Sequence, residues 1–150
     1  MIMLQWRSLL IGLAVAVPAW PAHADMEGCV KQAAQRYRVD ERLIRAIIQV
    51  ESGGNPSAMN RNANGSEDIG PMQINSSWLP VLSRYGIQRH HLDDPCTNVH
   101  VGAWVLAGNI ARYGYTWRAV GAYNARSHAR RKGYVAKVWR RFMASRASES

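Results

Sequence analysis

Glu51 is the first residue whose position could support chemistry, because it stands on the apolar side of a helical pattern. It follows Ile44, Ile47 and Ile48 by seven, four and three residues, so a helix places its carboxyl on their face. Burial there disfavours the ionised form, and we therefore expect a raised pKa for Glu51, as a general acid near neutral pH requires. A glutamate that ends a helix can also reach solvent or pair with an arginine, so this feature alone leaves both interpretations open.

A second carboxylate, Asp68, follows 17 residues later in a stretch rich in turn-forming residues. If the chain folds back over the helix end, the two carboxylates flank one cleft. Glycoside cleavage needs such a pair, with one carboxyl protonated and the other ionised to stabilise developing positive charge. Glu67 is the less favoured partner, because in a strand it points to the face opposite Asp68. An exposed turn aspartate accounts for Asp68 equally well.

Helical periodicity in most of the chain predicts the elements that hold these carboxylates. Asp40 is expected to cap the helix that carries Glu51, and Ser52-Gly53-Gly54 to end it. The period disappears between residues 55 and 75, where a small β-hairpin insert is expected. Five other helices are predicted. The first buries Cys29, Ala33 and Tyr37, the second runs from Ser76 or Ser77 to near Gly86, and the third runs from Asp94-Pro95 to Gly114. The fourth is capped by Thr116, and the last has an inner face of Tyr134, Val135, Val138, Trp139 and Phe142. The predicted fold class is mainly α (α+β).

The first 24 residues have the pattern of a secretory signal. Arg7 supplies a positive start, Leu9 to Val17 an apolar run, and Ala22-His23-Ala24 a small-residue cleavage site. The apolar run is too short for a transmembrane helix. We therefore predict a signal peptide at 1–24 and a single domain at 25–150.

Positive charge dominates the composition. The formal net charge is +9, and it falls to +8 when residues 1–24, with Arg7 as their single charged residue, are removed. Exported proteins rarely meet nucleic acid, so an anionic cell wall or membrane surface is the expected partner. Much of this charge lies between residues 126 and 146, which a solvated helix face explains equally well. No second hydrophobic span follows the signal, so stable membrane insertion is not expected.

Cys29 and Cys96 are the only two cysteines of the chain. Because an exported chain meets oxidising conditions, a disulfide is expected in preference to a metal or redox pair. The histidines show no HExxH or comparable ligand spacing, so neither a metal site nor a metal cofactor is predicted.

Three ordered segments resemble the signatures of the soluble lytic transglycosylases: Glu51-Ser52-Gly53-Gly54-Asn55-Pro56, Gly70-Pro71-Met72-Gln73-Ile74-Asn75 and Ala122-Tyr123-Asn124-Ala125. The resemblance runs from about Cys29 to Val138 and is greatest to small exported members that accompany secretion systems and type IV pili. It implies a lysozyme-like fold, a periplasmic location and cleavage of the bond between N-acetylmuramic acid and N-acetylglucosamine, with a 1,6-anhydro product. Peptidoglycan strands are the implied substrate, secretion-system or pilus components the implied partners, and no cofactor is implied.

The same resemblance implies roles for particular residues. Glu51 would protonate the glycosidic oxygen and then remove the proton from the muramyl 6-hydroxyl, while Tyr123 would hydrogen-bond and orient it. The implied substrate-binding residues are Ser52, Met72, Gln73, Asn75 and Asn124. Core positions for Tyr123 and Met72, and turn positions for Gln73 and Asn75, are the alternative interpretations.

Residues 60–75 also resemble animal-type lysozymes, with Asp68 at the position of their second catalytic carboxylate. Water could then compete with the 6-hydroxyl and give a lysozyme-type hydrolase that uses Glu51 and Asp68. Two positions depart from the transglycosylase pattern: Pro71 removes a backbone donor, and Arg126 replaces a glycine, which puts sugar contacts in doubt. A non-catalytic peptidoglycan-binding assembly protein is the remaining candidate, although a carboxyl turned towards an apolar face favours catalysis.

Overall fold

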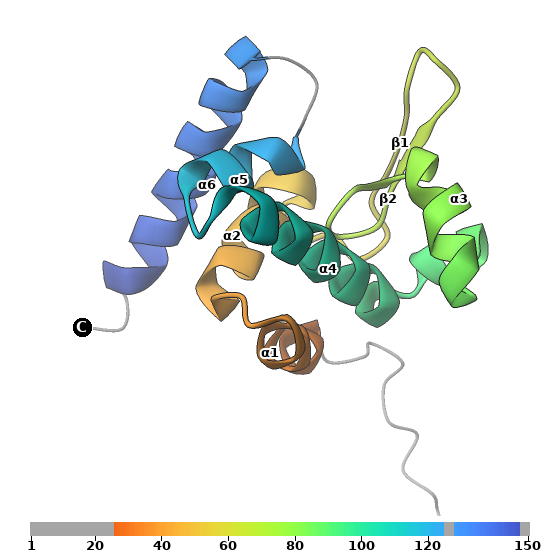
Figure 1. Ribbon diagram of the computed structural model, residues 1–150, viewed down its shortest axis with the longest axis horizontal. Helices are drawn as coiled ribbons and strands as arrows, with labels where there is room; N and C mark the ends of the chain where they lie inside the picture. Colours follow the sequence, from red (N-terminus) through yellow and green to blue (C-terminus); the bar gives the residue numbers. More distant parts are fainter. Residues whose placement is uncertain (1–25, 125–127, 148–150) are drawn as a thin grey trace, which may run out of the picture.

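The computed structural model describes residues 26–124 and 128–147 (Figure 1). Its elements are α1 (Met26–Tyr37), α2 (Glu41–Ser52), β1 (Met59–Arg61), β2 (Glu67–Ile69), β3 (Ile74–Asn75), α3 (Leu79–Leu82), α4 (Pro95–Tyr113), α5 (Trp117–Tyr123) and α6 (His128–Ala147). Short 3-10 helices at Ser76–Trp78 and Ser83–Tyr85 flank α3, and another at Arg89–Asp93 precedes α4. The mainly helical prediction with a small β insert is confirmed. The predicted signal peptide, and the departure at Arg126, lie outside the described residues.

The long helix α4 forms the centre of the domain and packs against α1 and α5. Helix α2 packs against α1 and α6, so it lies between the first and last helices of the domain. In Figure 1, α6 is at the left, and the strands and α3 are at the right of the helical body. The chain thus forms a helical body with a small β-containing lobe beside it.

Helix α2 is built as its sequence predicts. The Asp40 side chain accepts a hydrogen bond from the backbone N–H of Arg42, and Gly53 ends the helix in the left-handed region with φ 64°. Its buried residues are Leu43, Ile44, Ala46, Ile47 and Ile48. Glu51 therefore stands in the last turn of a helix whose position is fixed by a buried apolar face.

A disulfide joins α1 to α4 through Cys29 and Cys96, as predicted. Cys96 lies in the first turn of α4, where the Asp94 side chain accepts from the Thr97 N–H and Pro95 is within the tolerated first turn. A second link fixes α1, because the Arg45 guanidinium of α2 contacts Glu27 of α1 at 2.7 Å. The helix that carries Glu51 is thereby tied to the rest of the helical body.

The β insert is a three-stranded antiparallel sheet in the order β1-β2-β3, one strand more than the predicted hairpin. In its register Asp68 lies opposite Asn60 on β1 and opposite Asn75 on β3. Directly opposed residues share a face of a sheet, so this polar row lies together, and Glu67 points to the other face. The third strand forms because residues 70–73 turn the chain back, with Gly70 at φ 73° and the Gln73 N–H bonded to the Gly70 carbonyl.

Two local predictions are wrong. Thr116 does stand at the N-cap position of α5, but its hydroxyl donates to the Tyr113 carbonyl and makes no cap hydrogen bond. Trp139 was expected inside, yet 44% of it is exposed. It directly follows Val138, which is fully buried, and one residue turns a helix by about 100°. Trp139 instead contacts the ring of Trp117 edge to face near the surface.

Asn98 on α4 clamps the β-containing lobe to the helical body. It is fully buried, its Oδ1 accepts from the Met72 N–H at 3.0 Å, and its Nδ2 donates to the carbonyls of Ile69 at 2.7 Å and Leu92 at 3.1 Å. A Cβ at Gly70 would lie 2.2 Å from Asn98 Nδ2, so glycine is required for this close approach. The clamp holds the segment that follows Asp68.

We expect Asn98→Ala to lower the free energy of unfolding by about 3–5 kcal/mol, because three buried backbone groups lose their partner and a cavity opens. Urea unfolding followed by circular dichroism measures this loss. Asn109→Ala, on the same helix, is the matched control, because among the described residues Asn109 Nδ2 has no hydrogen-bond partner. A loss at Asn98 no larger than the loss at Asn109 would contradict the clamp.

Candidate active site

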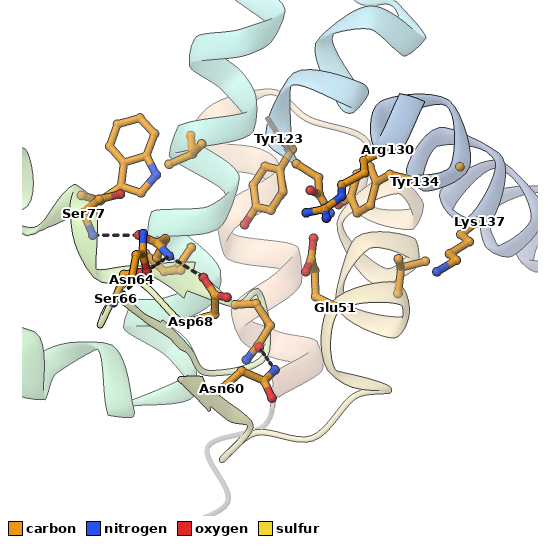
Figure 2. Close-up of a pocket in the computed structure, with 18 residues that line it drawn as sticks. Glu51, Asn60, Asn64, Ser66, Asp68, Ser77, Tyr123, Arg130, Tyr134 and Lys137 are labelled. Atoms are coloured by element: carbon orange, nitrogen blue, oxygen red, sulfur yellow. Dashed lines mark hydrogen bonds between the residues drawn. The ribbon is translucent and has the colours of Figure 1, made fainter. Parts of the chain in front are cut away.

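A cleft of about 830 Å³ lies where α2, α6 and the β-containing lobe meet (Figure 2). The residues that line it come from α2, the β insert and the 3-10 helix after it, α4, the end of α5, and α6. They are Val50, Glu51, Asn60, Asn64, Ser66, Asp68, Gln73, Ile74, Asn75, Ser77, Trp78, Val105, Tyr123, Asn124, Arg130, Gly133, Tyr134 and Lys137. Both predicted carboxylates, Glu51 and Asp68, are among them, and they project into the cleft from different lobes.

Tyr134 of α6 lies beside the Glu51 carboxyl in Figure 2, and Arg130 of the same helix lies next to it. Tyr134 is 5% exposed. Its burial is the main cause that raises its pKa well above the ordinary value, and the negative charge of Glu51 is the second. A polar contact with the Glu51 carboxyl acts in the same direction, although within the described residues no partner of the Tyr134 hydroxyl meets the distance and angle limits of a hydrogen bond. This hydroxyl is thus available to the carboxyl or to a bound polar group.

Tyr123 lies in the cleft but not in the expected contact. Its hydroxyl donates to the backbone carbonyl of Met72 at 3.0 Å, so its single proton is not directed at Glu51. Burial, and then the charge of Glu51, raise the pKa of Tyr123 well above its ordinary value. In this structure Tyr123 ties α5 to the turn before β3 and contributes its ring to the surroundings of Glu51.

Asp68 is held by amide side chains on its own sheet. Its Oδ1 accepts from Asn75 Nδ2 at 2.7 Å, and its Oδ2 accepts from Asn62 Nδ2 at 2.9 Å. Each of these amides also donates to the Ser66 hydroxyl at 3.1 Å. The network fixes the direction in which the Asp68 carboxylate faces the cleft.

Glu67 has a different role from its neighbour Asp68. Its carboxylate binds Arg89 at 3.0 Å and Arg61 at 3.1 Å, and these guanidinium hydrogen bonds, that of Arg89 first, hold the pKa of Glu67 below its ordinary value. It does not line the cleft. The expected opposition of Glu67 and Asp68 across the strand is therefore confirmed.

Gln73 adopts a backbone conformation that is uncommon for a residue with a side chain, with φ 51°. Its Nε2 donates to the Gly70 carbonyl at 2.9 Å, and its Oε1 accepts from Asn60 Nδ2 at 2.6 Å. Such conformations cost about 1–3 kcal/mol and gather at functional sites. The amide of Gln73 is consequently a fixed part of the cleft wall.

Two residues expected to bind substrate, Met72 and Ser52, lie elsewhere, as does Pro71. Met72 is fully buried and packs against Gly102, so it is part of the core and contributes only its carbonyl near the site. Ser52 donates to the Ile48 carbonyl at 3.1 Å and does not line the cleft. Pro71 is fully buried beside Met72. The cause is the same for Met72 and Pro71, since the Asn98 clamp draws this turn into the core.

The structure adds cleft residues that the sequence analysis did not single out for the site. Tyr134 and the two cations Arg130 and Lys137 come from α6, and Asn60 and Asn64 come from the β insert. The apolar period of α6 could have pointed to Tyr134, but nothing local connects it to Glu51, which is 83 residues earlier. No three His, Cys, Asp or Glu side chains gather as metal ligands within the described residues. In the same part of the chain, no helix combines the length and apolar character needed to cross a membrane.

A helical body, a small antiparallel sheet, and a glutamate at a helix end that faces the cleft between them define a lysozyme-like protein. The chain belongs to the transglycosylase SLT domain family, whose model matches residues 28–138. It is similar to the invasion protein IagB of Salmonella typhimurium (strain SL1344), with 41% identity over 119 residues, 76% of this chain and 74% of that protein. The protein IpgF of Shigella flexneri is 38% identical over 126 residues, 81% of this chain and 83% of its own length. The X polypeptide of Escherichia coli is 38% identical over 128 residues, 81% of this chain and 76% of its own length.

Proposed function

We propose that this protein is a peptidoglycan lytic transglycosylase that cleaves the β-1,4 bond between N-acetylmuramic acid and N-acetylglucosamine. The observation that carries the proposal is the Glu51 carboxyl, held in the last turn of α2 within a cleft of about 830 Å³ that the buried Tyr134 and the partly buried Tyr123 also line. Membership of the transglycosylase SLT domain family supports the same conclusion.

In the proposed reaction Glu51 acts first as an acid and then as a base. It donates its proton to the glycosidic oxygen, the bond from that oxygen to muramyl C1 breaks, and N-acetylglucosamine leaves as an alcohol. The carboxylate then takes the proton of the muramyl 6-hydroxyl, whose oxygen bonds to C1 and closes a 1,6-anhydro ring. Glu51 ends protonated, and no water is consumed. In this scheme Tyr134 takes the orienting role that the resemblance implies for Tyr123.

A lysozyme-type hydrolysis is the second candidate, and the hydrogen-bonded Asp68 favours it. A fixed carboxylate across the cleft from the acid would stabilise positive charge at C1 long enough for water to attack. The product would then carry a reducing end and one more water than the anhydro sugar. Mass spectrometry of the soluble muropeptides released from purified peptidoglycan distinguishes these two outcomes, and release of neither by folded protein would favour a non-catalytic peptidoglycan-binding assembly protein.

We expect the wild-type protein to release anhydro products and Asp68→Asn to slow their release about tenfold, which corresponds to about 1.4 kcal/mol of lost transition-state stabilisation. The asparagine keeps the size of the side chain but removes the charge. Glu67→Gln is the matched control, because Glu67 faces away from the cleft, and it should retain near wild-type rates. Reducing-end products that disappear in Asp68→Asn would instead establish the hydrolase.

We further propose that residues 1–24 direct export, that the protein acts in the periplasm, and that it opens local gaps in peptidoglycan for a secretion or pilus machine. The pattern of the first 24 residues supports export. The name of the relative IagB, an invasion protein, supports the link to such a machine. Cell fractionation with an antibody to the domain tests the location, and retention of the protein in the cytoplasm would contradict it.

A further inference from the structure

Two cations of α6 line the cleft on either side of Tyr134. Arg130, Tyr134 and Lys137 are spaced by four and three residues, so they share one face of the helix. Tyr134 occupies the middle of this face and is buried, whereas Arg130 and Lys137 are exposed. Figure 2 shows both cations on the side of the cleft that carries Glu51, across from Asp68 and Asn60. The cleft therefore has one cationic wall.

The separation of the two cations matches a short peptide. They are seven residues apart on a helix that rises about 1.5 Å per residue, so they stand roughly 10 Å apart along its axis. An extended chain advances about 3.3–3.6 Å per residue, and the same distance therefore spans about three residues. One extended peptide could reach both cations at once.

Lys137 supplies a charge on this wall that the described carboxylates do not pair with. Glu51 and Asp68 are the carboxylates that line the cleft, and the Asp68 carboxylate accepts hydrogen bonds from the amides of Asn75 and Asn62 on the other lobe. Lys137 forms no ion pair with any described residue. An exposed ammonium in a substrate cleft attracts an anionic group of the ligand more strongly than a neutral sugar.

We propose that Arg130 and Lys137 form a subsite for the carboxylates of the peptide stem that N-acetylmuramic acid carries. This inference rests on the proposed function, because in a peptide-bearing strand the lactyl carboxyl of N-acetylmuramic acid is amide-bonded to the stem, and the anionic groups are the carboxylates of the stems. The enzyme then prefers peptide-bearing strands to bare glycan. A stem that lies along α6 leaves the sugars against the amide wall of the β-containing lobe, with the scissile bond near Glu51.

The test compares kcat/KM on peptide-bearing glycan strands with kcat/KM on the same strands after an amidase has removed the stems and the lactyl carboxyls that this frees have been converted to amides. We expect the wild-type protein to favour peptide-bearing strands about fivefold to tenfold. Lys137→Ala should reduce this ratio about fivefold, mainly through KM, and Lys137→Glu should reduce it further. Lys132→Ala is the matched control, because Lys132 is an exposed lysine of α6 that does not line the cleft, and it should leave the ratio unchanged.

A binding experiment separates this inference from the proposed reaction. Glu51→Gln protein, with and without Lys137→Ala, is titrated with soluble peptide-bearing strands and with the same strands after the stems have been removed and the lactyl carboxyls amidated, and the Kd for each is measured. Loss of the preference for stems in the double variant supports the subsite even where no cleavage of either substrate is found, an outcome that would overturn only the proposed reaction. Equal binding and equal cleavage of the two substrates by wild-type protein would overturn the subsite. An equal effect of Lys132→Ala and Lys137→Ala would also overturn it, because it would indicate general charge attraction.

Discussion

Glu51→Gln is expected to reduce the release of soluble muropeptides by a factor of about 10²–10⁴, the range that general acid–base groups contribute. The substitution keeps the shape of the side chain and its polar contacts in the cleft but removes the proton that the leaving oxygen needs. Product release is measured by mass spectrometry under matched protein concentrations. The thermal unfolding temperature should stay close to that of the wild-type protein, because glutamine has nearly the size of glutamate and the buried residues of α2 are unchanged.

The control for this variant is Glu41→Gln on the same helix. Glu41 pairs with Arg45 in the first turn of α2 and does not line the cleft, so its variant should cleave at near wild-type rates. Retention of more than a tenth of the activity in Glu51→Gln would contradict an acid role for Glu51. It would then leave Asp68 as the remaining carboxylate of the cleft.

The raised pKa expected for Glu51 stays a prediction with its own measurement. A general acid must be protonated at the start of the reaction, so kcat/KM falls as the pH rises through its pKa. An ordinary glutamate has a pKa of about 4.3, and we expect the descending limb of the profile to lie at a higher pH than this. A descending limb at the ordinary pKa would show that the cleft does not raise the pKa of the Glu51 carboxyl.

Removal of the disulfide should produce a large loss of stability. Cys29 and Cys96 close a loop with a sequence separation of 67, for which the chain-entropy model gives about 4 kcal/mol. The Cys29→Ala, Cys96→Ala double variant should therefore unfold at markedly lower urea concentration than the wild-type protein. Wild-type protein treated with a reductant provides the control and should lose a similar amount. A loss below about 1 kcal/mol in both would indicate that contacts between α1 and α4 hold the two helices without the bond.

This stability bears on activity because the disulfide and the site share their supports. Helix α1 is bonded to α4 by the disulfide and to α2 by the pair of Glu27 with Arg45, and α2 carries Glu51. Helix α4 in turn carries Asn98, which holds the turn after Asp68. The two catalytic candidates thus depend on one connected framework.

The local sequence was sufficient for the elements and for the acid. Asp40 marks the start of α2 and Gly53 its end. A capping side chain and a left-handed glycine affect only the few residues next to them, so both ends can be predicted from the local sequence. The position of Glu51 among isoleucines follows from helical periodicity alone. The pairing of two cysteines in an exported chain is likewise a matter of composition, and the three ordered segments were enough to predict the family.

Which side chains line the cleft depends on contacts between residues that are distant in sequence. Whether Met72 faced a sugar or the core depended on Asn98, 26 residues later, whose amide draws that turn inward. The tyrosine nearest to Glu51 proved to be Tyr134, because the packing of α6 against α2 turns its buried face towards the carboxyl. The direction of the Asp68 side chain depends on the third strand, β3. This strand has only two residues, so it leaves no recognisable pattern in the sequence. Side-chain identity and periodicity are local properties, whereas the partner of a buried polar group is set by which elements the whole core brings together.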